Sequence, residues 1–103
     1  MAPAQQILDQ EIRVKARDAF HTAVEARARD LANDRVALAR VAERLFGEIV
    51  PFDQIPARCE EKIAYCLSRR HHWSYRPSGY LIHMTAIELR RAVEIVASRR
   101  EAA

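Results

Sequence analysis

Glycine and proline are scarce, with two glycines and four prolines among 103 residues. Repetitive β folds need many tight turns, and collagen-like or linker-type chains are rich in both residues, so neither class fits. Alanine, leucine, glutamate and arginine dominate instead, and these residues favour helices. Because 50% of the residues are hydrophobic, the chain has enough apolar side chain for a core. We therefore expect one mainly helical domain over residues 1–103.

Long apolar runs and cysteine clusters are also missing. No run approaches the roughly 18 residues that a membrane span requires, and residues 1–10 have no signal-peptide pattern. The two cysteines, Cys59 and Cys66, would lie roughly 10 Å apart on one helix, at about 1.5 Å per residue, which is beyond disulfide reach. We expect them to be buried thiols of a cytoplasmic protein that has no membrane partner.

Catalytic signatures are absent as well. The sequence has no nucleophile elbow, no glycine-rich phosphate loop and no HExxH zinc motif. The adjacent residues His71 and His72 would point to opposite faces of a strand, so they do not suggest a shared metal ion. The sequence thus predicts a protein that is not an enzyme, with no catalytic residue, no cofactor and no metal site.

Helical periodicity begins near the N-terminus. Residues 4–32 contain no glycine or proline, and apolar residues from Leu8 to Leu31 recur close to every 3.6 positions. This pattern predicts a long amphipathic helix over residues 1–33. Asn33 or Asp34 would end it and cap a second helix over residues 35–46, which Gly47 would stop. One continuous helix is the alternative, and its length would favour an elongated coiled-coil dimer.

A third helix is predicted over residues 54–70, with Asp53 as its N-cap, after a connector marked by two prolines. Its buried stripe would comprise Cys59, Ile63, Cys66 and Leu67. The opposite stripe would comprise Arg58, Lys62, Tyr65 and Arg69, whose steps of four, three and four residues place them along one helical face.

Residues 71–84 have a different pattern. Two short alternating runs flank Pro77-Ser78-Gly79, which predicts a β-hairpin, although a loop followed by a helix from Tyr80 is the competing interpretation. The run from Thr85 to Glu88 has the form of a capping box, so we expect the last helix to begin at Thr85. The domain would then comprise a helix over 1–33, a helix-turn-helix plus hairpin over 34–84, and a helix over 85–103. An all-α bundle with a long first helix is the alternative fold.

Positive charge gathers in the second half of the chain. Residues 1–54 have a net charge of −1 and residues 55–103 a net charge of +4, and no acidic residue lies between Glu61 and Glu88. That stretch contains the single tryptophan and all three tyrosines. A local positive field with aromatic side chains attracts polyanions.

The expected element order and the run from Ile82-His83-Met84-Thr85 into Ala86-Ile87-Glu88-Leu89 resemble the wing-to-helix junction of winged helix–turn–helix DNA-binding domains. The resemblance implies a dimeric transcriptional regulator that contacts duplex DNA through its third helix and its hairpin. The first and last helices would pair the two subunits. The implied nucleic-acid-binding residues are Arg58, Lys62, Tyr65, Arg69, Arg70, His72, Trp73, Tyr75 and Arg76.

Two other functions remain open at this point. The chain could be a protein-interaction module, an adaptor or an inhibitor of a larger complex, that uses the first helix and Trp73 and presents its basic segment to an acidic partner protein. It could also bind single strands by stacking bases on Trp73 and Tyr75. Salt dependence separates the hypotheses, because nucleic-acid binding weakens steeply as salt rises.

Overall fold

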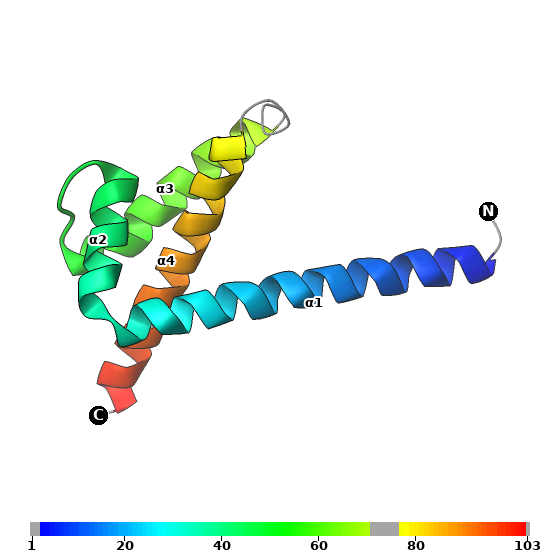
Figure 1. Ribbon diagram of the computed structural model, residues 1–103, viewed down its shortest axis with the longest axis horizontal. Coiled ribbons are helices and arrows are strands. Elements are labelled where there is room, and N and C mark those ends of the chain that lie inside the picture. The colour runs from blue at the N-terminus through cyan, green and yellow to red at the C-terminus, as the bar shows by residue number, and fades with distance from the viewer. Residues whose placement is uncertain (1–2, 71–76, 103) are drawn as a thin grey trace.

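The computed structural model describes residues 3–70 and 77–102. Within these ranges the fold is all-α, with four α-helices and no strand, so the prediction of a mainly helical chain is confirmed. Among the described residues, none of the helices combines the length and the apolar composition that a membrane span requires. The elements, shown in Figure 1, are α1 (Pro3–Asn33), α2 (Arg35–Phe46), the short 3-10 helix η1 (Phe52–Gln54), α3 (Ile55–Ser68) and α4 (Pro77–Ala102).

The first two helices are separate, as predicted. Asp34 has an extended backbone, and its side chain accepts a 3.0 Å hydrogen bond from the backbone N–H of Ala37. This N-cap satisfies a donor that the first turn of α2 leaves unpaired. At the other end Gly47 adopts the left-handed conformation with φ of 73°, which glycine tolerates best, and its N–H bonds to the carbonyl of Glu43. Local capping therefore sets both ends of α2.

The predicted β-hairpin is wrong over the residues that the structure describes. Residues 77–84 form the first two turns of α4, while residues 71–76 lie outside the description. Thr85 does not cap a helix, because its hydroxyl donates to the carbonyl of Leu81 one turn earlier. Proline suits a first helical turn, where its missing N–H costs nothing. The junction that carries the winged-helix resemblance is thus continuous helix.

Packing explains why the alternating pattern in residues 80–84 did not make a strand. The buried residues of α4 recur every three or four positions, as a helix requires, and begin before Thr85. They are His83, Ala86, Glu88, Leu89, Ala92, Val93 and Val96. A helix over this whole stretch buries one stripe against α3 and α1, whereas a strand would have divided the same residues between two faces.

The start of α3 also differs from the prediction. Pro51 begins a 3-10 turn, in which the N–H of Gln54 bonds to its carbonyl at 2.9 Å. Asp53 therefore lies inside η1 and does not cap α3. The predicted buried stripe is confirmed for Cys59 and Cys66, Ile63 is half-buried, and the prediction is wrong for Leu67, which is 47% exposed. Both cysteines are free thiols, and burial raises the pKa of Cys59 to about 12, which disfavours a thiolate nucleophile there.

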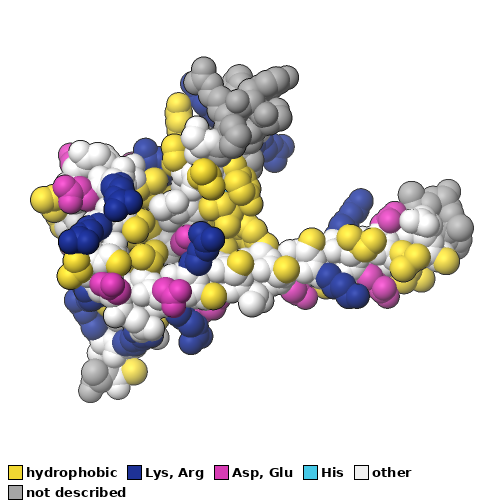
Figure 2. All heavy atoms as spheres, in the orientation of Figure 1, with side chains coloured by type: hydrophobic (Ala, Val, Ile, Leu, Met, Phe, Trp, Pro, Cys, Tyr) yellow, Lys and Arg dark blue, Asp and Glu magenta, His cyan; other side chains and the backbone are white. Residues whose placement is uncertain are grey.

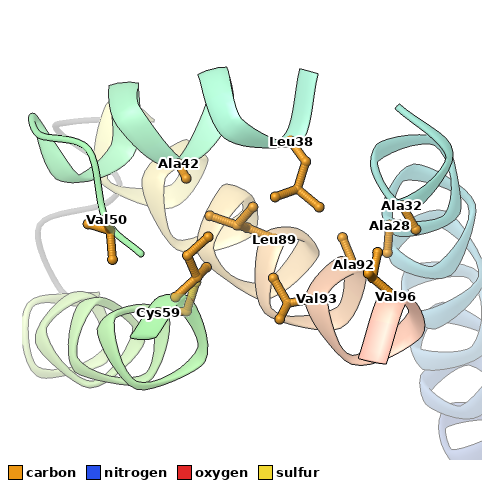
Figure 3. Close-up of a cluster of buried hydrophobic side chains, with 11 residues drawn as sticks. Ala28, Ala32, Leu38, Ala42, Val50, Cys59, Leu89, Ala92, Val93 and Val96 are labelled. Carbon is orange, nitrogen blue, oxygen red and sulfur yellow. The ribbon is translucent and has the colours of Figure 1, made fainter. Parts of the chain in front are cut away.

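The core lies where α4 meets the other three helices (Figure 3). Leu38 and Ala42 of α2, together with Cys59 of α3, converge on Leu89 of α4. Truncating a fully buried leucine of this kind costs about 2–5 kcal/mol in other proteins. The helix α4 is therefore the central element on which α2, α3 and part of α1 assemble.

Only the C-terminal part of α1 joins this core. We call residues 24–33 the root of α1 and residues 4–19 the arm. In the root, Ala28 and Ala32 pack against Ala92 and Val96 of α4, and these small side chains let the two helices approach closely. The arm projects away from the other helices (Figure 1).

Candidate interaction surfaces

The residues predicted to bind nucleic acid from α3 lie along one side of the helix. One of their positive charges, that of Arg58, is neutralised by an ion pair within the chain. Arg58 donates a 2.8 Å hydrogen bond to Glu48, and its guanidinium carbon lies 5.1 Å from the centre of the Phe46 ring. Lys62 is half-buried, and it lines a hollow of ≈ 430 Å³ together with Phe46, Arg58, Glu61 and Tyr65. Because α3 holds two acidic residues and two basic ones, the helix as a whole has no net charge.

The exposed positive charge lies at the far end of α3. Arg69 stacks on Tyr65, with its guanidinium carbon 5.3 Å from the ring centre, and Arg70 is exposed beside it. Tyr65 itself is 58% exposed. The other predicted contacts, His72, Trp73, Tyr75 and Arg76, lie outside the described residues. The structure therefore groups Tyr65, Arg69 and Arg70 at one end of the molecule.

Two arginines of α4 bind side chains in the root of α1, one through an ion pair and one through a hydrogen bond to a neutral amide. Arg91 donates two hydrogen bonds to the carboxylate of Glu25, at 2.7 and 2.9 Å, a paired geometry that orients both side chains. This contact holds the pKa of Glu25 below its ordinary value, and it raises the pKa of Arg91. Arg99 bonds to the side-chain oxygen of Asn33 at 2.8 Å, at the last residue of α1. These contacts fix the direction in which the arm leaves the body of the molecule, which is formed by the root, α2, α3 and α4.

A buried acid lies at the same crossing. Glu88 of α4 is largely buried, and its nearest ionic partner, the exposed Arg27 of α1, is 3.9 Å away. Burial raises the pKa of Glu88, and the Arg27 charge opposes that rise. An open groove of ≈ 890 Å³ runs beside this crossing, between Phe20 and Val24 of α1 and Ile87 of α4.

The arm is the part of the molecule with least contact. All its side chains are exposed except that of Asp9, which is half-buried and accepts a hydrogen bond from Gln5. Within the described chain, no hydrogen bond or ion pair links residues 4–19 to another helix. Figure 2 shows hydrophobic side chains on this projecting helix among basic and acidic ones. The expectation of a long first helix is confirmed, but most of its apolar residues lie outside the core.

The arm and the root present different apolar faces. At about 100° per residue, Leu8, Ile12, Ala16, Ala19 and Ala23 lie within about 40° of one another's mean direction. We call these five residues the outer stripe. Ala28 lies about 160° around the axis from Ile12, so the root packs on α4 with nearly the opposite face. The prediction of one amphipathic face along all of α1 is therefore wrong, and the phase change between the two stripes is the signal that could have revealed it.

No family model, curated protein or solved structure matches the chain. Within the described residues, no group of three or more histidine, cysteine, aspartate or glutamate side chains is placed to hold a metal ion. We base the functional hypotheses on two of these surfaces, the outer stripe and the basic end of α3.

Proposed function

We propose that the chain is a protein-interaction module whose projecting arm binds an apolar helix through the outer stripe. The single observation that carries the proposal is the exposure of the arm. Within the outer stripe, Leu8 and Ile12 are 52% and 63% exposed although both are large aliphatic residues. Contiguous exposed apolar side chains of this kind are typical of binding surfaces, whereas isolated ones are ordinary.

Helix energetics support the same proposal. Isolated helices shorter than roughly 12–15 residues are marginal in water, and the arm is little longer than that. Most helical stability in proteins comes from a packed face instead. The root supplies that packing for residues 24–33, and the described chain supplies none for the arm. A partner helix on the outer stripe would supply it, and i/i+4 apolar anchors are how such helices are recognised.

Photo-crosslinking tests the proposal on the full chain. A photoreactive amino acid replaces Ile12, in the centre of the outer stripe, or Gln10, which lies about 160° around the helix axis. Both positions are exposed, so the pair differs mainly in the face presented. We expect a discrete crosslinked product from position 12 and none from position 10, in the cells that make the protein.

The identity of the product separates the possible partners. A crosslink from position 12 to any defined protein, including the chain itself, supports the module. Equal labelling from both positions, or no product from either, would refute a role for the outer stripe.

A second candidate function, binding of duplex DNA, is supported by one specific feature. Arg69 and Arg70 project at the end of α3, beside a chain segment that contains no acidic residue up to Glu88. Fluorescence anisotropy with random duplex across a salt series tests this function, because neutralised phosphates release counterions and binding weakens steeply with salt. The double variant Arg58→Glu with Arg69→Glu should abolish binding. An acidic protein partner would instead bind the same end without duplex competing.

A further inference from the structure

We propose that the helix that covers the outer stripe is the arm of a second copy of this chain, running antiparallel, with the two-fold axis level with residue 13. This inference rests on the proposed function, since it names the occupant of the same surface. It makes the interface isologous, so each contact between the two copies occurs twice.

The charge order along the arm favours this occupant. Asp9 and Glu11 precede Arg13, Lys15 and Arg17, and with Asp18 the arm has no net charge. Reversing a second copy about residue 13 brings Glu11 level with Lys15 of that copy. Both residues lie on the same edge of the outer stripe, about 100° and 60° from Ile12, and equivalent edges meet in an antiparallel pair. Within the described chain neither Glu11 nor Lys15 is already in an ion pair.

On the other edge, Asp9 becomes level with Arg17 of the second copy, although Arg17 lies about 140° around the axis from Ile12. The two Arg13 side chains meet at the axis, so one like-charge contact opposes the four opposite-charge ones. A parallel second copy in register would instead bring Lys15 between Arg13 and Arg17 of that copy, which are like charges. The charges therefore distinguish the antiparallel arrangement from the parallel one.

The apolar residues interlock in the same register. Leu8 of one copy comes level with the space between Ala16 and Ala19 of the other, so a large side chain meets two small ones. The two Ile12 side chains lie next to each other near the axis. Alternating large and small residues across facing helices allow close packing, as in knobs-into-holes contacts.

The bodies do not obstruct this pairing. The root begins at Val24, so the starts of the two bodies are about 33 Å apart along the pair, at about 1.5 Å per residue. Each body also lies on the side of α1 that faces away from the outer stripe. The arms can thus overlap over most of their length while the bodies stand at opposite ends.

A charge-swap experiment tests the register. Glu11→Lys gives a chain with two bases at the paired positions, and Lys15→Glu gives a chain with two acids. We expect sedimentation equilibrium to show wild-type dimers in the micromolar range. Each variant alone should dimerise about tenfold more weakly, because two attractive exposed contacts become repulsive. An equimolar mixture of the two variants should regain wild-type association, since every paired position is again opposite in charge.

Gln10→Lys is the matched control, because it adds a charge on the opposite face of the arm and should leave dimerisation unchanged. Wild-type chain that stays monomeric, or dimers that both swaps leave intact, would overturn this inference. Position-12 crosslinks to a different protein, with a monomeric wild type, would overturn the second copy as occupant while the interaction module stands. If position 12 forms no crosslink at all, the proposed function is refuted, and the inference that rests on it is refuted with it.

Discussion

The arm and the root belong to one uninterrupted helix, yet their surroundings differ sharply. In the root, Ala28 is fully buried against α4, and Glu25 and Asn33 are held by two arginines of that helix. In the arm, Ile12 is 63% exposed. The comparison shows that helix formation and burial are separate outcomes here, since propensity makes the helix continuous but only contact with α4 stabilises part of it.

The largest expected difference in the free energy of unfolding is between truncation of Leu89 in the core and truncation of Ile12 in the arm. Leu89→Ala should lower the free energy of unfolding by about 2–5 kcal/mol, because it leaves a cavity where α2, α3 and α4 converge. Ile12→Ala should change it by no more than about 0.5 kcal/mol at concentrations where the chain is monomeric. Urea unfolding followed by circular dichroism measures both. Equal losses would show that the arm packs within its own chain.

The same comparison of root and arm can be made by replacing one alanine in each with the larger leucine. Ala28→Leu should cost about 1–3 kcal/mol, because the root has no space for a larger side chain against α4. Ala16→Leu, at an exposed position of the arm, should change the free energy of unfolding by no more than about 0.5 kcal/mol at concentrations where the chain is monomeric. Thermal unfolding of the two variants provides the test, and a tolerant position 28 would contradict the close approach of the helices.

The smallest expected effect concerns the ionic contact at the root. The pKa of Glu25 is depressed in the folded chain, so its pairing with Arg91 stabilises the fold above the ordinary pKa of 4.5. That contribution is lost as pH falls through the depressed value. Arg91→Met should therefore reduce stability slightly at neutral pH, and the difference from wild type should shrink on acidification. The urea midpoints of both proteins, measured across the acidic range, give this difference in stability. A difference that does not change with pH would show that the loss comes from packing.

Local sequence signals predicted α2 well and the first turns of α4, residues 77–84, poorly. The ends of α2 depend on Asp34 and Gly47. Each of these residues acts within one helical turn, so its effect can be predicted from the sequence alone. The false hairpin arose because Tyr80, Ile82 and Met84 alternate over a short run. The three-to-four spacing of His83, Ala86 and Leu89 was equally present, and burial against α3 and α1 made it decisive.

For the candidate surfaces, too, some features could be predicted from the sequence and others could not. The predicted stripe holds for Arg58, Lys62 and Tyr65 on α3, whereas Arg69 follows the helix, because α3 ends at Ser68 and does not reach residue 70. Pairing of Arg58 with Glu48 could not be predicted, because it depends on how the loop after α2 returns to α3. The exposure of the outer stripe was equally hidden, since apolar residues at helical spacing are usually core.

By itself the sequence determined the helical class, the break at Asp34 and the charge order along residues 9–17, because each follows from interactions within a few residues. Only the tertiary structure decided which face of α1 is buried. The small residues Ala28 and Ala32 meet Ala92 closely enough to pack, and this contact directs the opposite face, with Leu8 and Ile12, away from the body. The surface we assign to a partner is thus a consequence of where the core stops.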